Sequence, residues 1–251
     1  GSGVECGGYV LIRRTGVTSY VETPHLECGE SYVSDSYIKD GLLGYWKLDG
    51  NAEDSSGHNR HGTAHGSPNT VDCKFGQCYN LDGSSYISVP HDEVISRQVF
   101  GTAEEFTLSA WIYPMLWQSH AGIINKTSGG NWSNTTAGIW TGTYGVRVIM
   151  GSNEGSNPSG SYITVGHNPG LNDWHHIVGV ADGTNLSLYV NGDFIGSTAI
   201  SGITRTRSEN SNSIVLGRRH ATNFTGRIQN VRVYNRALTE EEILHNYNIS
   251  K

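Results

Sequence analysis

Acidic residues are the first candidates for chemistry, because a retaining glycosidase needs two carboxyl groups about 5 Å apart. On one strand, that geometry requires positions i and i+2 or i+4 on the same face. The acidic clusters are Glu104-Glu105, before an expected strand, and Glu240–Glu242, at the start of an expected helix, where negative charge is favoured. The sequence also has no nucleophile-elbow, phosphate-loop or dinucleotide motif. We therefore expect a protein without enzymatic activity.

Four cysteines are the next candidates: Cys6, Cys28, Cys73 and Cys78. A structural zinc site made of four cysteines uses two closely spaced pairs, and Cys6 with Cys28 does not form one. An even cysteine count instead favours disulfides in an oxidising environment. We expect two intrachain disulfides between sequence neighbours, Cys6–Cys28 and Cys73–Cys78.

Aromatic side chains gather in or beside a stretch rich in Gly, Ser and Asn, residues 115–145. They are Trp117, Trp132, Trp140 and Tyr144. Exposed aromatic rings on loops can stack on sugar rings, so these four are candidate sugar-binding residues. The alternative is that they cover the edge of a sheet.

Six asparagines stand in N-x-[ST] sequons, which mark N-glycosylation sites in secreted proteins. They are Asn125, Asn131, Asn134, Asn185, Asn223 and Asn248. Together with the even cysteine count, they favour an extracellular glycoprotein, with the loop sequons as the preferred sites.

The elements that position these residues are short strands. Glycine is abundant, with 33 residues in 251, and it supplies the positive φ angles that tight turns need. Asn191-Gly192 between two strand patterns predicts a type I′ hairpin. Thr239, with Glu242 three positions later, predicts a helix over residues 239–247, the only helix we expect. Strands at this spacing with one terminal helix predict an antiparallel sandwich or barrel.

Five segments, in order, carry a family resemblance: Gly41–Asp49, Cys73–Gly83, Phe106–Pro114, Trp174–Gly192 and Gly226–Ile243. They resemble the laminin G-like jelly-roll domain of the concanavalin A-like lectin/glucanase superfamily. The resemblance implies an all-β fold, an antiparallel two-sheet jelly-roll sandwich with one short C-terminal helix. It covers a domain of residues 41–251 and leaves residues 1–40 as an N-terminal β-rich extension. Because this fold serves many functions, function has to be argued from sites.

The resemblance also implies one structural calcium ion. Asp54 matches a family calcium ligand, but the second aspartate of the closing motif is replaced here by Gln229, followed by Asn230. An amide oxygen can bind calcium but brings no charge. The implied site, with Asp54 and Asn230 as its ligands, is therefore weakened or lost. The alternative role for Asp54 is an Asx turn.

The extension contains an apolar β-rich stretch, Tyr9–Glu22, which predicts a hairpin or one kinked strand. We expect it to add to a sheet edge of a neighbouring subunit, because open edges carry unpaired backbone groups. Its inward-facing residues would be Val10, Ile12 and Val17 or Val21. Two alternatives remain: the stretch pairs with its own domain, or Cys6–Cys28 closes it into a separate hairpin.

Two functions from different classes follow. The preferred one is a non-enzymatic extracellular or cell-surface structural protein, an adhesion or filament subunit that binds copies of itself or other surface proteins. The alternative is a carbohydrate-binding lectin module. With a net charge of −6 and no basic run beyond pairs such as Arg218-Arg219, we expect no nucleic-acid partner. No apolar stretch is long enough to insert into a membrane.

Overall fold

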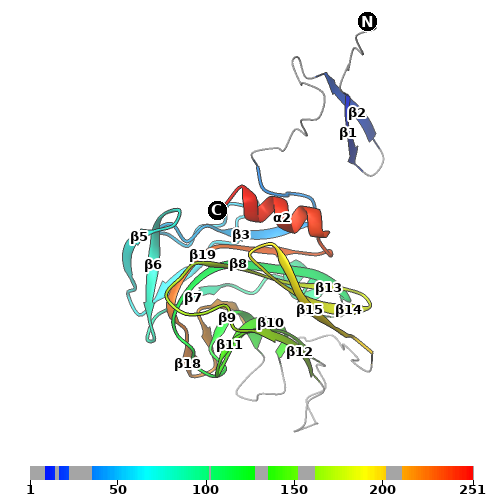
Figure 1. Cartoon of the computed structure of the whole chain (residues 1–251). Coiled ribbons are helices and arrows are strands. Elements are labelled where there is room, and N and C mark those ends of the chain that lie inside the picture. The colour runs from blue at the N-terminus through cyan, green and yellow to red at the C-terminus, as the bar shows by residue number, and fades with distance from the viewer. Residues whose placement is uncertain are drawn as a thin grey trace, which may run out of the picture. The chain divides into compact units, whose positions relative to one another are not determined.

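The computed structural model describes residues 9–14, 17–22, 36–101, 103–127, 135–151, 162–201 and 211–250. The chain divides into two compact units, Gly1–Tyr37 and Ile38–Lys251. The larger unit is built from two antiparallel sheets, which lie one above the other in Figure 1. The expected two-sheet sandwich is thus confirmed.

The first sheet has eight strands, and its strand order places the first and last strands of the larger unit next to each other. Strand β3 pairs with β19, which also lies between β8 and β6. The sheet order is β15 (Asp193–Ala199), β14 (Asn185–Val190), β13 (His175–Asp182), β8 (Glu105–Leu116), β19 (Thr225–Tyr234), β6 (Gly76–Asp82) and β5 (Asn69–Cys73), with β3 (Leu42–Trp46) off this path.

The second sheet has seven strands and carries the pockets described below. Its order is β12 (Tyr162–His167), β11 (Gly145–Gly151), β10 (Thr135–Gly142), β9 (Gly122–Thr127), β16 (Ile214–Leu216), β7 (Tyr86–Val89) and β4 (Thr63–His65). Two short strands, β17 (Arg218–Arg219) and β18 (Thr222–Asn223), pair with each other directly after β16.

The core lies between the two sheets, because every second residue of a strand points to the same face. Leu108 and Leu188 of the first sheet belong to one buried apolar cluster with Ile139 and Val148 of the second. The sheets approach closely at Gly179, where an added Cβ would lie 2.2 Å from a methyl carbon of Val148. A side chain at this position would force the sheets apart.

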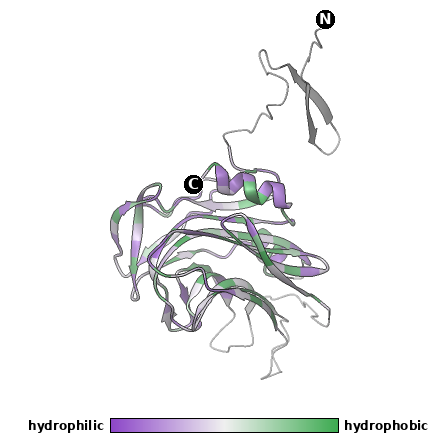
Figure 2. Cartoon of the chain, in the orientation of Figure 1, coloured by the Kyte–Doolittle hydropathy of each residue, from purple (hydrophilic) through white to green (hydrophobic). Residues whose placement is uncertain are grey.

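Turn chemistry follows the sequence prediction at the β14–β15 hairpin. Asn191 and Gly192 both have positive φ, 55° and 88°, as a type I′ turn requires. The expected C-terminal helix is α2, Glu240–Asn248, and it begins with the predicted capping box between Thr239 and Glu242. In Figure 2 this helix is mostly hydrophilic with an apolar band, consistent with burial of one side.

A second helix was not expected from the sequence. Helix α1 (Glu93–Gln98) begins where the Asp92 side chain accepts a hydrogen bond from the backbone N–H of Ile95. The expectation of a single helix is therefore corrected. Asp92 is a good N-cap residue, but six helical residues are too few to give a clear apolar period.

The stretch expected as a hairpin or kinked strand is a hairpin. Strands β1 (Tyr9–Arg14) and β2 (Val17–Glu22) pair antiparallel, with Val10 opposite Val21 and Ile12 opposite Ser19. They form a two-stranded sheet of their own.

Candidate functional site

The outer face of the seven-stranded sheet is defined by its register. Val146, Val148 and Met150 of β11 point into the core, so Arg147 and Ile149 lie on the opposite face. One cross-strand row on this outer face runs from β7 to β12 through Ser88, Val215, Asn125, Gly138, Ile149 and Thr164. Next to it, Trp140 pairs with Arg147, and Arg147 pairs with Gly166.

A pocket of about 520 Å³ opens where this face meets the β10–β11 turn. We call it the turn pocket, and besides three glycines it is lined by residues Tyr144, Val146, Arg147, Thr164, His167 and Asn168. Tyr144 stands in the turn and is 80% exposed. Arg147 is also exposed, so an aromatic ring and a guanidinium are both open to a ligand.

Glycines form the floor of the turn pocket. A Cβ on Gly142 would lie 2.7 Å from Nε of Arg147, and one on Gly166 would lie 3.2 Å from its Cγ. The Arg147 side chain therefore lies across two positions without side chains. Gly145 has a φ of 144°, and a Cβ there would lie 2.1 Å from the carbonyl oxygen of His167. Only glycine allows the turn to come this close to the end of β12.

The electrostatic surroundings of the turn pocket are positive. Burial lowers the pKa of His120, and the positive charges of Arg219 and Arg147 lower it further. The described residues that line the pocket include no aspartate or glutamate. Its polar groups can therefore bind hydroxyl or anionic oxygens, but no pair of carboxyl groups is present there for hydrolysis.

The four aromatic sugar-binding candidates are placed very differently. Tyr144 lies in the turn pocket. The prediction that Trp140 binds a sugar is wrong, because this residue is only 7% exposed and the Arg219 guanidinium lies over its ring. Trp117 is partly buried and packs against the core, which favours the edge-covering alternative. Trp132 lies outside the described residues.

The implied calcium site does not fit the residues present. Both carboxylate oxygens of Asp54 accept hydrogen bonds from the chain: Oδ1 from the N–H groups of Tyr45 and Ser56, Oδ2 from the Ser56 hydroxyl and the Arg60 N–H. Burial raises the pKa of Asp54, but these hydrogen bonds outweigh it and hold the pKa below its ordinary value. Oδ1 of Asn230 accepts from the Tyr45 hydroxyl at 2.8 Å. In the described part of the chain, no group of three His, Cys, Asp or Glu residues could hold a metal ion.

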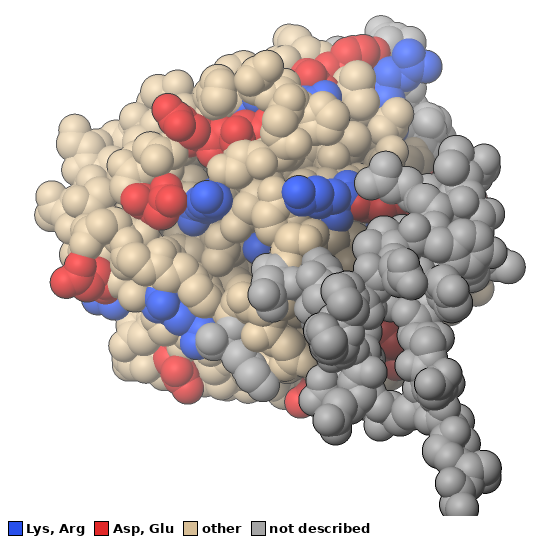
Figure 3. Space-filling view, turned by 90° about the horizontal axis from the view of Figure 1, so that it is seen from above, with Lys and Arg blue, Asp and Glu red and all other residues tan. Residues whose placement is uncertain are grey.

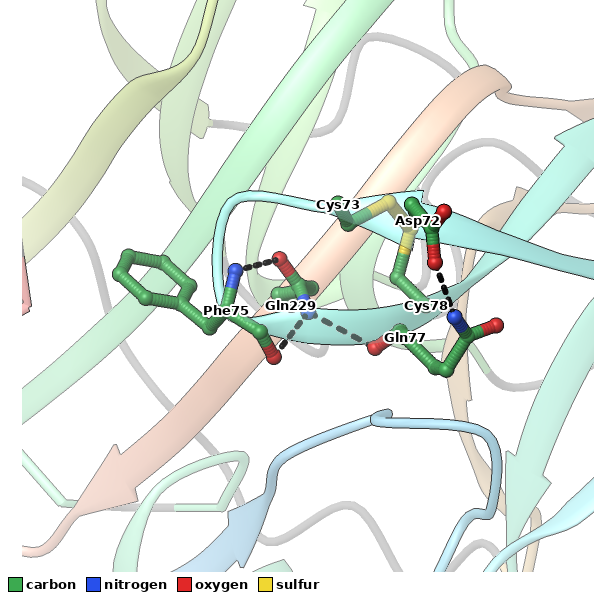
Figure 4. Close-up of a disulfide and its surroundings, with 6 residues drawn as sticks. All are labelled: Asp72, Cys73, Phe75, Gln77, Cys78 and Gln229. Carbon is green, nitrogen blue, oxygen red and sulfur yellow. Dashed lines mark hydrogen bonds between the residues drawn. A yellow bond between two sulfur atoms is a disulfide. The ribbon is translucent and has the colours of Figure 1, made fainter.

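Gln229, which replaces the family aspartate, holds the β5–β6 turn. Its Nε2 donates to the carbonyl oxygens of Phe75 and Gln77, and its Oε1 accepts from the N–H of Phe75. Figure 4 shows this side chain reaching the turn beside the Cys73–Cys78 disulfide. That disulfide is confirmed, and the amide of Gln229 serves the hairpin rather than a metal. Cys6 and Cys28 lie outside the described residues.

The prediction of N-glycosylation is wrong for one of the six sequons. Asn125 is 1% exposed, and its Nδ2 donates to the carbonyl oxygens of Val215 and Arg218, so it cannot carry a glycan in this fold. Asn223 and Asn185 are half-buried, and Asn223 donates to the Gly83 carbonyl. Asn248 is exposed. Asn131 and Asn134 lie outside the described residues.

Two carboxylates of the acidic cluster Glu240–Glu242 have structural roles at α2. The Glu242 carboxylate pairs with both terminal nitrogens of Arg236, each at 2.7 Å, and completes the capping box. Glu240 accepts a hydrogen bond from the Tyr189 hydroxyl. These carboxylates are held by the chain itself. Among the described residues, no helix is long and apolar enough to cross a membrane.

A family model described as the concanavalin A-like lectin/glucanases superfamily matches residues 81–244, more than half of the chain. The chain belongs to this superfamily. The expected laminin G-like resemblance is thus confirmed. We found no match among curated proteins.

Solved structures share the fold at low sequence identity. The binding domain of Paraclostridial Mosquitocidal Protein 1 is 22% identical with a TM-score of 0.66, covering 84% of this chain and 52% of its own. Domain 4 of the extracellular arabinanase AbnA from Geobacillus stearothermophilus, solved with arabinotriose, is 19% identical with a TM-score of 0.63, covering 84% of this chain and 98% of its own. The receptor-binding domain of botulinum neurotoxin C/D mosaic serotype is 18% identical with a TM-score of 0.66, covering 84% and 52%.

This chain spans about half the length of the two toxin domains and nearly all of the arabinanase domain. At such identities the similarity shows the shared fold alone.

Proposed function

We propose that this protein is a non-catalytic glycan-binding module whose sugar site is the turn pocket. The observation that carries the proposal is the exposed ring of Tyr144 beside the guanidinium of Arg147, over a floor of glycines. A ring face next to a few fixed polar groups is the arrangement that orients a small ligand in a pocket. Thr164 and Asn168 add hydroxyl and amide groups that can pair with sugar hydroxyls.

The superfamily neighbours support this proposal. Domain 4 of the arabinanase was solved with arabinotriose, and a binding domain of botulinum neurotoxin serotype D was solved with N-acetylneuraminic acid. The first is one domain of a larger enzyme, and the second is described as a ligand-binding domain. A non-catalytic role here also agrees with the carboxylates of α2, which are engaged in capping and ion pairing.

A glycan array tests the proposal, followed by titration of the best ligand with variants. We expect Tyr144→Ala to weaken binding about tenfold or more, since a ring that a ligand stacks on contributes strongly to affinity. Phe194→Ala is the matched control, because Phe194 is a 52% exposed aromatic residue of the other sheet. Equal weakening by both variants, or no glycan bound by the wild-type protein, would refute the proposal.

A second candidate function is assembly through the N-terminal hairpin, in an extracellular or cell-surface protein that contacts copies of itself or other surface proteins. In the described part of the chain, β1 and β2 pair only with each other. An isolated two-stranded hairpin is marginally stable in water, and both outer edges can accept another strand. Deletion of residues 1–28 followed by analytical ultracentrifugation tests this. Assembly that survives the deletion excludes the hairpin as the linking element.

A further inference from the structure

A second pocket, of about 660 Å³, lies on the same outer face but at the other end of the seven-stranded sheet. We call it the sheet pocket, and it is lined by His65, Tyr86, Ser88, Asn125, Arg218 and His220 among others. Strand β7, which carries Tyr86 and Ser88, is four strand positions from β11. At the usual spacing that is about 19 Å. The two pockets also share no lining residue, so they are separate sites.

A stacked aromatic pair forms one wall of the sheet pocket. His65 and Tyr86 are cross-strand partners of β4 and β7, and their rings stack with centroids 4.5 Å apart and planes 12° apart. Nε2 of His65 lies 2.8 Å from the Ser88 hydroxyl, which fixes the ring further. Both side chains are thus held in place before any ligand arrives.

Arg218 is positioned against this wall. Its guanidinium carbon lies 4.6 Å from the centre of the Tyr86 ring, and its Nε donates to the carbonyl oxygen of His220 at 2.6 Å. Among the described residues, the His220 carbonyl is the hydrogen-bond acceptor of this side chain, which leaves its two terminal nitrogens for a ligand of the pocket that Arg218 lines. A guanidinium anchored through Nε presents its planar fork to a ligand.

The buried Asn125 positions the backbone of Arg218. Its Nδ2 donates to the Arg218 carbonyl oxygen at 2.6 Å and to the Val215 carbonyl oxygen at 3.2 Å. An asparagine that is 1% exposed on the outer face of a sheet needs such partners, because a buried amide without them is costly. Asn125 is therefore a positioning residue: its amide holds the backbone of β16 and of Arg218, which follows that strand.

The charge around the sheet pocket selects the ligand. The protein has a net charge of −6, yet none of the described residues lining this pocket is acidic. His65, Arg218 and His220 line it, and Arg219 follows directly in the chain. On the α2 face, by contrast, acidic and basic groups are interspersed, as Figure 3 shows. Among the described residues that line the sheet pocket, the Arg218 guanidinium therefore has no acidic side chain beside it.

We infer that the sheet pocket binds a carboxylate group of a sugar ligand, held by the Arg218 fork beside the His65–Tyr86 wall. A carboxylate is planar and accepts two parallel N–H bonds from a guanidinium, which a neutral sugar cannot do. That the carboxylate belongs to a sugar rests on the proposed function. Recognition of the carboxylate itself rests only on this pocket.

NMR titration of the full chain tests the inference, with the Arg218 Nε–H resonance as the local probe. The ligands are trigalacturonate, its uncharged methyl ester and galactose 6-sulfate. We expect trigalacturonate to shift this resonance and to bind about tenfold or more tightly than its ester. Arg218→Gln should weaken trigalacturonate binding by a similar factor, while Arg218→Lys retains part of it. Arg227→Gln is the matched control, since Arg227 also lies over a tyrosine ring, that of Tyr113 at 5.0 Å.

Each outcome decides between the two proposals. Equal binding of the acid and the ester, weakened by Tyr144→Ala, overturns the carboxylate site and leaves the proposed function intact. Acid-specific binding that Arg218→Gln weakens and Tyr144→Ala leaves unchanged supports the carboxylate site and overturns the turn pocket. Stronger binding of the sulfate, or equal loss in the Arg218→Gln and Arg227→Gln variants, overturns the inference. Thermal unfolding of each variant excludes misfolding as the cause.

Discussion

The guanidinium carbon of Arg219 lies 3.5 Å from the centre of the Trp140 ring, and both side chains are buried on the outer face of the seven-stranded sheet. Burial lowers the pKa of Arg219 to about 10, so the side chain is still charged at neutral pH. A desolvated cation over an indole ring is among the stronger interactions of this type. The pair thus closes the part of the face that lies next to Arg147 of the turn pocket.

Arg219→Ala should therefore destabilise the protein by about 2 kcal/mol and expose the Trp140 indole. The measurements are urea unfolding and the tryptophan emission maximum, which should move to longer wavelength. Arg218→Ala is a suitable comparison, because Arg218 lies over Tyr86 and is only half-buried. If Arg219→Ala left both stability and emission unchanged, the pair would have no energetic role.

Removal of the Cys73–Cys78 disulfide should have a moderate and local effect on the stability of the protein. It closes the β5–β6 hairpin, with Cys73 opposite Gly76 in the register. Replacing both cysteines with serine should lower the free energy of unfolding by about 2 kcal/mol, the value expected for so short a loop. Binding at the turn pocket should not change. A loss well above that value would mean that the β5–β6 hairpin supports the rest of the sheet.

Elements of the fold can be predicted from the sequence wherever the local preferences of neighbouring residues agree with the tertiary packing. The capping box at Thr239 and the turn at Asn191-Gly192 are decided by neighbouring residues, so both were predicted correctly. Trp140 shows where this reasoning fails. Its burial depends on Arg219 of β17, which is distant in the sequence and lies over the ring only in the folded chain.

The candidate sites show the same limit. Tyr144 could be found because it lies in a stretch rich in Gly, Ser and Asn, a composition typical of exposed turns. The sheet pocket could not, because His65, Asn125 and Arg218 come from three separate strands and meet only through the register of β4, β7, β9 and β16. The Asn125 sequon likewise gave no sign that this amide would be used inside the fold.

Stability should fall in acid because of His176. This ring is fully buried, and its Nε2 shares a hydrogen bond of 2.8 Å with the Ser109 hydroxyl. It also lies against the rings of Trp111 and Tyr247. Burial, together with the positive charge of Arg232, lowers the pKa of His176 to about 3. Between about pH 6.5 and pH 3 the unfolded chain binds a proton that the folded chain does not, so the free energy of unfolding decreases as the pH falls through this range.

Urea unfolding at several pH values checks this dependence, and His176→Phe separates it from the carboxylates. The phenylalanine ring keeps the aromatic contacts but does not titrate, so the variant should lose less stability between pH 6.5 and pH 4 than the wild-type protein. An identical pH dependence in both proteins would assign the acid sensitivity to other groups, such as Asp54 and Asp92, whose pKa values are also lowered.

Asp54 should stabilise the protein through hydrogen bonds and not through calcium. Its carboxylate accepts two backbone or hydroxyl donors on each oxygen, which leaves no strong acceptor position for an ion. Asp54→Asn replaces one oxygen by an NH2 group that faces two donors. The loss should be about 1–3 kcal/mol, the cost of leaving buried donors unpaired. Thermal unfolding of the wild-type protein should be the same in EDTA and in calcium chloride. A melting temperature that rises with calcium, and does so only while Asp54 is present, would restore the metal site and show that the carboxylate exchanges its chain donors for the ion.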